Sequence, residues 1–293
     1  MSILKHISLI VFLFIGSIAM SQKYTSVSFE FYKEKSYDSA LVYINKAIET
    51  DEKNNSQTWQ LRGFLYKVLE LESNTTLREL SINSFIQAYK ANATHKDSIE
   101  IKKHLTHVNI RYYNDAVNQI SSHELELSVE SYKIYKNNCE VFGLEHKDFN
   151  EMDVPYYNAI AGSYIEFNKS KIAIEKIGYY TKAIRYYNKI LVIDSLNYKA
   201  NYGIGLSYYN QAVDLIMAMD PFETNIEDIN DIQNRSIFLF KKGEPFFLKA
   251  YSLKPKELEV LEGLAGIYNS MNENEKFKFY EELLEEVKGN GNE

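Results

Sequence analysis

The sequence predicts an all-α fold, an α-solenoid of about six helical hairpins stacked in chain order, some with lengthened helices. A small residue, an aromatic residue four positions later and an apolar residue three further on recur along the chain. This spacing occurs at Ala183, Tyr187 and Ile190, and again at Gly243, Phe247 and Ala250. Steps of three and four residues place such positions on one face of a helix. The 293 residues also include only 4 prolines and 12 glycines, which favours long uninterrupted helices.

The segment between these two matches, Ile204–Tyr208, has the order apolar, Gly, two further residues and Tyr, and Pro255 follows the second match. Together these patterns resemble the tetratricopeptide repeat (TPR), a helix–turn–helix unit of about 34 residues. The resemblance covers nearly the whole chain after residue 21. It implies TPR-like hairpins that each bury an apolar face against their neighbours. It also implies a concave groove, lined by the first helix of each hairpin, that holds peptides or helices of partner proteins.

The first three hairpins follow this spacing, the third least regularly. Their first helices are marked by Tyr24–Phe31, Trp59–Tyr66 and Leu105–Tyr112, and their second helices by Ala40–Ala47, Ser81–Ala88 and Ser128–Tyr135. The second hairpin is predicted to be lengthened around the polar segment Glu72–Thr76, whose residues suit an exposed loop. Phe142–Asp153 is predicted to be a longer polar connection and the weakest point of the array.

The last three hairpins carry the clearest signals. The fourth is predicted to open at Pro155, a favourable residue in a first helical turn. The fifth pairs Tyr198–Met219 with Ile232–Leu253 around an acidic tip at Asp220–Asp231, and the sixth ends in the amphipathic segment Glu275–Val287, which suits a solubilising cap. We therefore expect one TPR-like repeat domain over residues 22–288, followed by a disordered tail over residues 289–293.

Residues 1–21 are expected to be a secretory signal peptide rather than part of the fold. Lys5 precedes the apolar run Ile7–Met20, which is shorter than the roughly 20 residues that a membrane span needs. Small residues stand at the right spacing for cleavage before Gln22. An uncleaved anchor is the alternative. The expected location is periplasmic or secreted, in a bacterial cell envelope, with no integral membrane segment after cleavage.

The residues give little indication of catalysis or metal binding. There is no Gly-rich phosphate loop and no G-x-S-x-G motif, and the single cysteine, Cys139, is expected to be a buried small hydrophobe. His104 and His107 share a helix face, but no further ligands accompany them as zinc would require. The acidic tip does not match a calcium loop. We therefore expect no enzyme, no cofactor and no metal, and the formal net charge of −7 argues against nucleic acid as a partner.

The expected function is an exported protein-binding scaffold or adaptor that holds partner segments in the concave groove. Counting one turn on either side of each signature residue gives candidate groove residues, which include Phe29, Tyr32, Phe64, Lys103, Tyr113, Asn114, Lys199, Tyr202, Tyr209 and Asn210. Tyr208, one position away from Tyr209, is expected to pack inside its hairpin. Two alternatives stay open: an exported enzyme or small-ligand-binding protein with a pocket between the lengthened hairpins, and a passive spacer in an envelope assembly.

Overall fold

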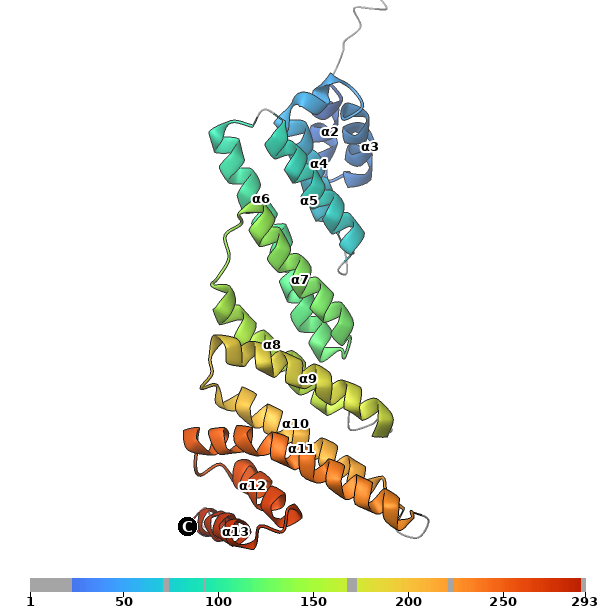
Figure 1. Cartoon of the computed structure of the whole chain (residues 1–293). Helices are drawn as coiled ribbons and strands as arrows, with labels where there is room; N and C mark the ends of the chain where they lie inside the picture. The colour runs from blue at the N-terminus through green and yellow to red at the C-terminus, as the bar shows by residue number, and fades with distance from the viewer. Residues whose placement is uncertain (1–22, 71–73, 92, 168–172, 221–223, 291–293) are drawn as a thin grey trace, which may run out of the picture. The chain divides into compact units, whose positions relative to one another are not determined.

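The computed structural model describes residues 23–70, 74–91, 93–167, 173–220 and 224–290. This part of the chain contains twelve α-helices, one short 3₁₀ helix and no β-strand (Figure 1). The predictions of an all-α fold and of about six hairpins are therefore confirmed. The predicted signal peptide lies outside the described residues. None of the described helices is both long enough and apolar enough to cross a bilayer.

The helices pair in chain order. The pairs are α2 (Tyr24–Lys33) with α3 (Tyr37–Ala47), α4 (Ser56–Leu69) with α5 (Thr75–Lys90), α6 (His95–Ser121) with α7 (Leu125–Phe142), α8 (Phe149–Phe167) with α9 (Ala173–Ile193), α10 (Tyr198–Met217) with α11 (Ile226–Leu253), and α12 (Leu258–Ser270) with α13 (Asn274–Asn290). The 3₁₀ helix, Asp51–Asn54, lies between the first two pairs. The lengthened helices expected in the fifth pair are present as α10 and α11.

The described chain forms two compact units. The first contains α2 to α5 and, from the third hairpin, residues up to Asp115 and Glu130–His146. The second contains Ala116–Val129, which is the tip of that hairpin, and the chain from Lys147 onward. The division therefore passes through the third hairpin, whose sequence keeps the repeat spacing least well.

Asparagine side chains begin four of the helices. Asn55, Asn74, Asn197 and Asn225 stand just before α4, α5, α10 and α11, and each side-chain oxygen accepts a hydrogen bond from a backbone N–H in the first turn. Such a cap satisfies an N–H that has no partner inside the helix, and it contributes about 1 kcal/mol. The caps fix where each helix starts and therefore which residues share its faces.

The helix caps also explain why the predicted starts of two helices were wrong. Asp148 accepts a hydrogen bond from the backbone N–H of Asn150, so α8 begins at Phe149. Pro155 consequently lies inside α8 instead of opening it, and the connection predicted at 142–153 covers only residues 143–148. Asn225 caps α11 in the same way, so α11 begins at Ile226, inside the tip predicted at 220–231.

The acidic residues Glu227 and Asp228 lie in the first turn of α11, where negative charge interacts favourably with the helix dipole. At the other end of the unit, α13 continues through Asn290, so the first two residues of the predicted tail are helical. Among the described residues there is no group of three or more His, Cys, Asp and Glu side chains that could hold a metal ion.

The core of the second unit is organised around Phe247, which is fully buried. A Cβ atom on Gly205 would lie 2.8 Å from its ring, and one on Gly263 would lie 2.5 Å from it. Gly243 brings α11 close to α10 in the same way, because a Cβ there would lie 3.1 Å from the carbonyl oxygen of Gly205. The predicted role of Gly243, Phe247 and Ala250 as packing residues is confirmed, since the small positions are where helices approach.

The first unit repeats this arrangement. Gly63 faces the buried ring of Phe85, which would lie 2.9 Å from an added Cβ atom, and the Ser81 hydroxyl donates a hydrogen bond of 2.8 Å to the Gly63 carbonyl oxygen. The second helix of a hairpin thus packs its aromatic residue onto the small residue of the first.

Cys139 is 2% exposed, so the prediction of a buried cysteine is confirmed.

A buried charged cluster also joins helices of the first unit. The Arg78 side chain, 1% exposed, donates to Glu70 Oε1 at 2.7 Å and to Asp115 Oδ2 at 2.6 Å. Arg111 donates to the second oxygen of Glu70 at 2.5 Å, and the guanidinium of Arg78 lies 4.5 Å from the ring centroid of Tyr112. Arg78 and the two carboxylates are buried, whereas Arg111 is 33% exposed at the edge of the cluster. Opposite charges therefore compensate one another, which is the condition under which buried charges are tolerated.

Candidate functional site

The first helices of the last three hairpins share one register. Their small residues and tyrosines are Ala161 and Tyr164 in α8, Gly205 and Tyr208 in α10, and Ala265 and Tyr268 in α12. Six residues before these small residues stand Pro155, Lys199 and Glu259, and three residues before them stand Asn158, Tyr202 and Glu262. Equivalent helical positions in stacked hairpins line the same surface.

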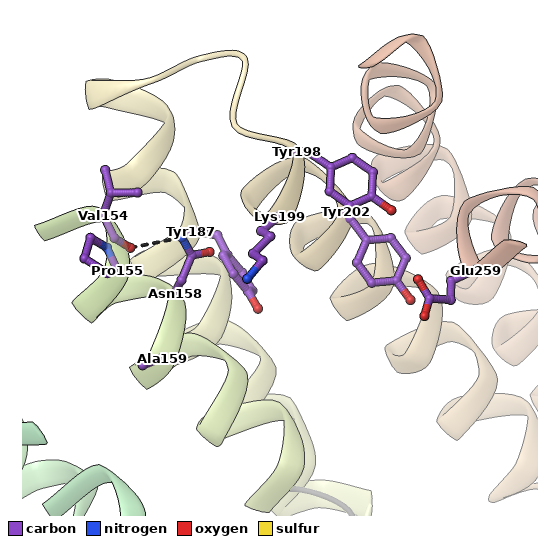
Figure 2. Close-up of a pocket in the computed structure, with 9 residues that line it drawn as sticks. All are labelled: Val154, Pro155, Asn158, Ala159, Tyr187, Tyr198, Lys199, Tyr202 and Glu259. Carbon is purple, nitrogen blue, oxygen red and sulfur yellow. Dashed lines mark hydrogen bonds between the residues drawn. The ribbon is translucent and has the colours of Figure 1, made fainter. Parts of the chain in front are cut away.

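The six positions that precede the small residues, with the exception of Glu262, line a groove of the second unit with a cavity volume of about 680 Å³ (Figure 2). The groove is lined by Val154, Pro155, Asn158 and Ala159 of α8, Tyr187 of α9, Tyr198, Lys199 and Tyr202 of α10, and Glu259 of α12. Eight of these nine residues belong to the first helices of the three hairpins. We call this surface the α8–α10–α12 groove.

Packed tyrosine rings form one side of the groove. Gly203 lets the ring of Tyr187 rest directly on α10, because an added Cβ atom would lie 2.3 Å from that ring. Tyr198 and Tyr202 stack with their centroids 6.1 Å apart and an angle of 6° between the rings. Tyr202 also meets Phe247 edge-on at 5.9 Å, which ties the groove to the core. Rings held in this way present flat apolar surfaces to the groove.

Two polar atoms of the groove lining are covered yet have no hydrogen-bond partner among the described residues. They are the hydroxyl oxygen of Tyr198 and the side-chain oxygen of Asn158. The Asn158 amide nitrogen donates to the Val154 carbonyl oxygen at 3.0 Å, and this bond determines which way the amide points (Figure 2). A covered polar group without a partner costs about 1–3 kcal/mol. A ligand that supplied an acceptor to Tyr198 and a donor to Asn158 would recover this energy.

The tyrosine hydroxyls of the groove stay protonated at neutral pH. Burial raises the pKa of Tyr198 and of Tyr202 to about 12 each, and the negative charge of Glu259 adds to both shifts. Both hydroxyls are therefore hydrogen-bond donors under physiological conditions. Lys199 and Glu259 themselves are exposed and place one positive and one negative charge in the groove.

Lys199 and Tyr202 are the two predicted groove residues that line this groove. Tyr209 packs in the core instead: its ring centroid lies 5.5 Å from that of Phe240, and a Cβ atom on Gly266 would lie 2.6 Å from its hydroxyl oxygen. Tyr209 is half-buried there and is not among the residues that line the α8–α10–α12 groove. Tyr208 packs as expected beside Gly243, whose added Cβ would lie 3.2 Å from the Tyr208 Cβ. Asn210 is half-buried and does not line the groove.

The remaining predicted groove residues belong to the first unit. Phe64 packs edge-on against Phe85 at 5.4 Å and against His104 at 4.5 Å, and Tyr113 lies 5.6 Å from Tyr135. These two rings therefore contribute to packing. The others are more accessible. Phe29 is 48% exposed and stacks with Tyr32, Lys103 pairs with Glu100 at 3.4 Å, and Asn114 is exposed.

The sequence reasoning missed Asn158, Tyr198 and Glu259. Asn158 was overlooked because the fourth hairpin was taken to begin at Pro155, which left too little helix before the signature residues. The register itself was a usable signal, since Asn158 stands as far before Ala161 as Tyr202 stands before Gly205. Nothing in the sequence indicated that the Tyr198 hydroxyl would lack a partner, because that depends on the neighbouring hairpin.

Comparisons with known proteins add context for the fold. No protein-family model matches the chain, and no curated protein matches its sequence. Among solved structures, the C-terminal part of a TPR repeat-containing protein from Cytophaga hutchinsonii is 16% identical, with 91% of this chain and 80% of that chain covered and a TM-score of 0.37. The TPR2AB domain of yeast Sti1 in complex with pHSP90 is 16% identical, with 93% and 99% covered and a TM-score of 0.26.

The human IFIT1 dimer with m7Gppp-AAAA is also similar, at 18% identity, with 85% of this chain and 46% of that chain covered and a TM-score of 0.31. Two of these three structures are TPR proteins by name. The helical hairpins of this chain are shown by its own helix pairs and by the packing of small residues on aromatic rings.

Proposed function

We propose that this protein is an exported binding scaffold whose α8–α10–α12 groove holds an extended peptide segment of a partner protein. The observation that carries the proposal is the pair of covered, unpartnered polar atoms, Tyr198 Oη and Asn158 Oδ1, beside an aromatic surface. A hydroxyl that needs an acceptor and an amide oxygen that needs a donor are complementary to a peptide bond, which offers one of each.

The shape and composition of the groove support the same proposal. It is open and crosses the first helices of three successive hairpins, so it can accept a chain that continues on both sides. Tyrosine rings provide large apolar contacts at low entropic cost, because each has few rotatable bonds. The ring stack of Tyr198 and Tyr202 is already in place before any ligand arrives, which lowers the cost of binding.

The test removes a single atom. Tyr198→Phe deletes the unpartnered hydroxyl and keeps the ring stack, so the melting temperature should stay the same or rise slightly. Affinity for peptides selected on the wild-type protein from a random-peptide phage library should fall about two- to tenfold, the value of one hydrogen bond. Isothermal titration calorimetry of the selected peptides on both proteins measures this change.

A matched control is Tyr251→Phe, which makes the same change on a half-buried tyrosine of α11 outside the groove. Its peptide affinity should equal that of the wild type. Asn158→Ala should weaken binding as Tyr198→Phe does, since its only described bond is local to α8. Equal affinity for all four proteins would show that the selected peptides bind elsewhere. The groove volume also falls in the range of small-molecule sites, so a library that yields no peptide would favour a small ligand.

The second part of the proposal is export. It rests on the apolar run Ile7–Met20 and on the small residues before Gln22. Mass spectrometry of the protein purified from its native host should find the mature N-terminus at Gln22 or within a few residues of it. Recovery of the chain with Met1 intact from the soluble cytoplasmic fraction would contradict export, and it would leave the proposed groove function untouched.

A further inference from the structure

The groove carries its two charges in a fixed order. Lys199 of α10 and Glu259 of α12 occupy the same register position on successive first helices, and Pro155 holds that position on α8. Figure 2 shows the ring of Tyr202 between the two charged side chains. A segment crossing the groove from α8 towards α12 would therefore meet a positive charge, then an aromatic ring, and then a negative charge.

Lys199 and Glu259 are also the charges near the groove that the described part of the chain leaves unpaired. Lys254 pairs with Glu257 at 3.0 Å, and Glu262 pairs with Lys288 at 3.3 Å. Neither Lys199 nor Glu259 forms an ion pair with another described residue. Their charges are therefore available to a ligand, whereas those of their neighbours are already partly compensated.

From this arrangement we infer that the groove selects dipolar peptide segments, with an acidic side chain beside Lys199, an apolar residue over Tyr202 and a basic side chain beside Glu259. The inference rests on the proposed peptide-binding function and specifies its ligand. A uniformly acidic segment would place a carboxylate next to Glu259, and a uniformly basic one would place an ammonium group next to Lys199. Like charges placed together weaken a complex and exclude wrong partners more effectively than opposite charges strengthen it.

Three synthetic peptides test the inference. They share the apolar centre of a library-selected binder and carry glutamate and lysine at the two ends, glutamate at both ends, or lysine at both ends. At low salt, where exposed charges are least screened, the wild-type protein should bind the dipolar peptide at least about fivefold more tightly than either of the others. Fluorescence anisotropy with a dye attached outside these positions measures the three dissociation constants.

Charge reversal should move the preference in a defined way. Lys199→Glu should favour the peptide with lysine at both ends, and Glu259→Lys should favour the peptide with glutamate at both ends. The double variant Lys199→Glu/Glu259→Lys should again favour the dipolar peptide, bound in the opposite direction. Lys256→Glu and Glu285→Lys alter exposed charges outside the groove by the same amounts, and they should leave the wild-type order unchanged.

The outcomes separate this inference from the function on which it rests. If the three peptides bind equally to every variant, the charge order plays no part in selection, and the groove remains a peptide site that Tyr198→Phe still weakens. If the control variants change the preference as strongly as the groove variants, the selection arises from overall charge and the inference is wrong. If no library peptide binds at all, both the inference and the proposed function fail.

Discussion

Replacing Arg78 with methionine is expected to destabilise the first unit by about 3–5 kcal/mol, the largest effect we expect from a single charged residue. Methionine fills much of the same space but leaves the buried carboxylates of Glu70 and Asp115 without their shared partner. Glu70 keeps its hydrogen bond from Arg111, whereas Asp115 loses the bond of 2.6 Å that Arg78 provides. Most of the expected cost therefore comes from removing the positive charge that pairs with both buried carboxylates.

The chain offers a local reporter for this experiment. Its single tryptophan, Trp59, lies in α4 of the first unit, so tryptophan fluorescence during urea unfolding follows that unit. The transition should move to lower urea concentration in Arg78→Met. The control is Lys33→Met in the same unit, because Lys33 is exposed and its pair with Glu30, at 2.6 Å, lies on the surface. Exposed pairs of this kind contribute roughly 0–1 kcal/mol, so its transition should hardly move.

A triple variant distinguishes charge from packing. Arg78→Met combined with Glu70→Gln and Asp115→Asn removes the uncompensated charges and keeps the shapes, so it should recover part of the lost stability. If the triple variant is as unstable as Arg78→Met alone, the cluster stabilises the unit through the shape and stacking of Arg78 on Tyr112, and the electrostatic explanation is wrong. The guanidinium lies 4.5 Å from the centroid of that ring, which is close enough for a cation–π interaction to contribute to stability.

The charged cluster also shows where sequence reasoning stops. Glu70 lies 8 residues before Arg78 and Asp115 lies 37 residues after it, and the three follow no periodic pattern, so nothing in the sequence brought them together. The packing residues were predictable because their spacing repeats within a single helix, and Gly63, Gly243 and Phe247 lie where that spacing places them. Local periodicity determines which face of a helix is buried, whereas the choice of partner across hairpins depends on the completed fold.

The predicted groove illustrates the same limit. Tyr202 and Tyr209 lie seven residues apart, so they share a face of α10, and the pattern could not distinguish them. The structure does, because Gly266 of α12 lets Tyr209 pack against the next hairpin while Tyr202 borders the groove. The position at which a helix starts also limited how well the groove residues could be predicted. An N-cap at Asp148 starts α8 at Phe149 instead of Pro155, and Val154, which lies in the added part of the helix, lines the site.

Replacing Phe247 with alanine is expected to cost about 3–5 kcal/mol, because the ring is fully buried and its removal leaves a cavity. The matched control is Phe238→Ala on the same helix, where the ring is 57% exposed and the cost should stay within about 0.5 kcal/mol. Hydrogen exchange monitored by mass spectrometry should show faster exchange in α10, α11 and α12 for Phe247→Ala alone. If both variants exchange like the wild type, Phe247 is not the packing centre of the unit.

Gly263 provides the sharper test, because its effect should change sign with Phe247. In the wild-type protein, Gly263→Ala would place a methyl group 2.5 Å from the Phe247 ring, which should cost about 1–3 kcal/mol. In the Phe247→Ala background the ring is gone, so the same methyl group enters empty space and alanine's higher helix propensity should stabilise α12 by up to about 1 kcal/mol. The two substitutions should therefore be strongly non-additive in a double-mutant cycle. Additive effects would mean that Gly263 does not accommodate the Phe247 ring, and that the close approach of α11 to α12 has another cause.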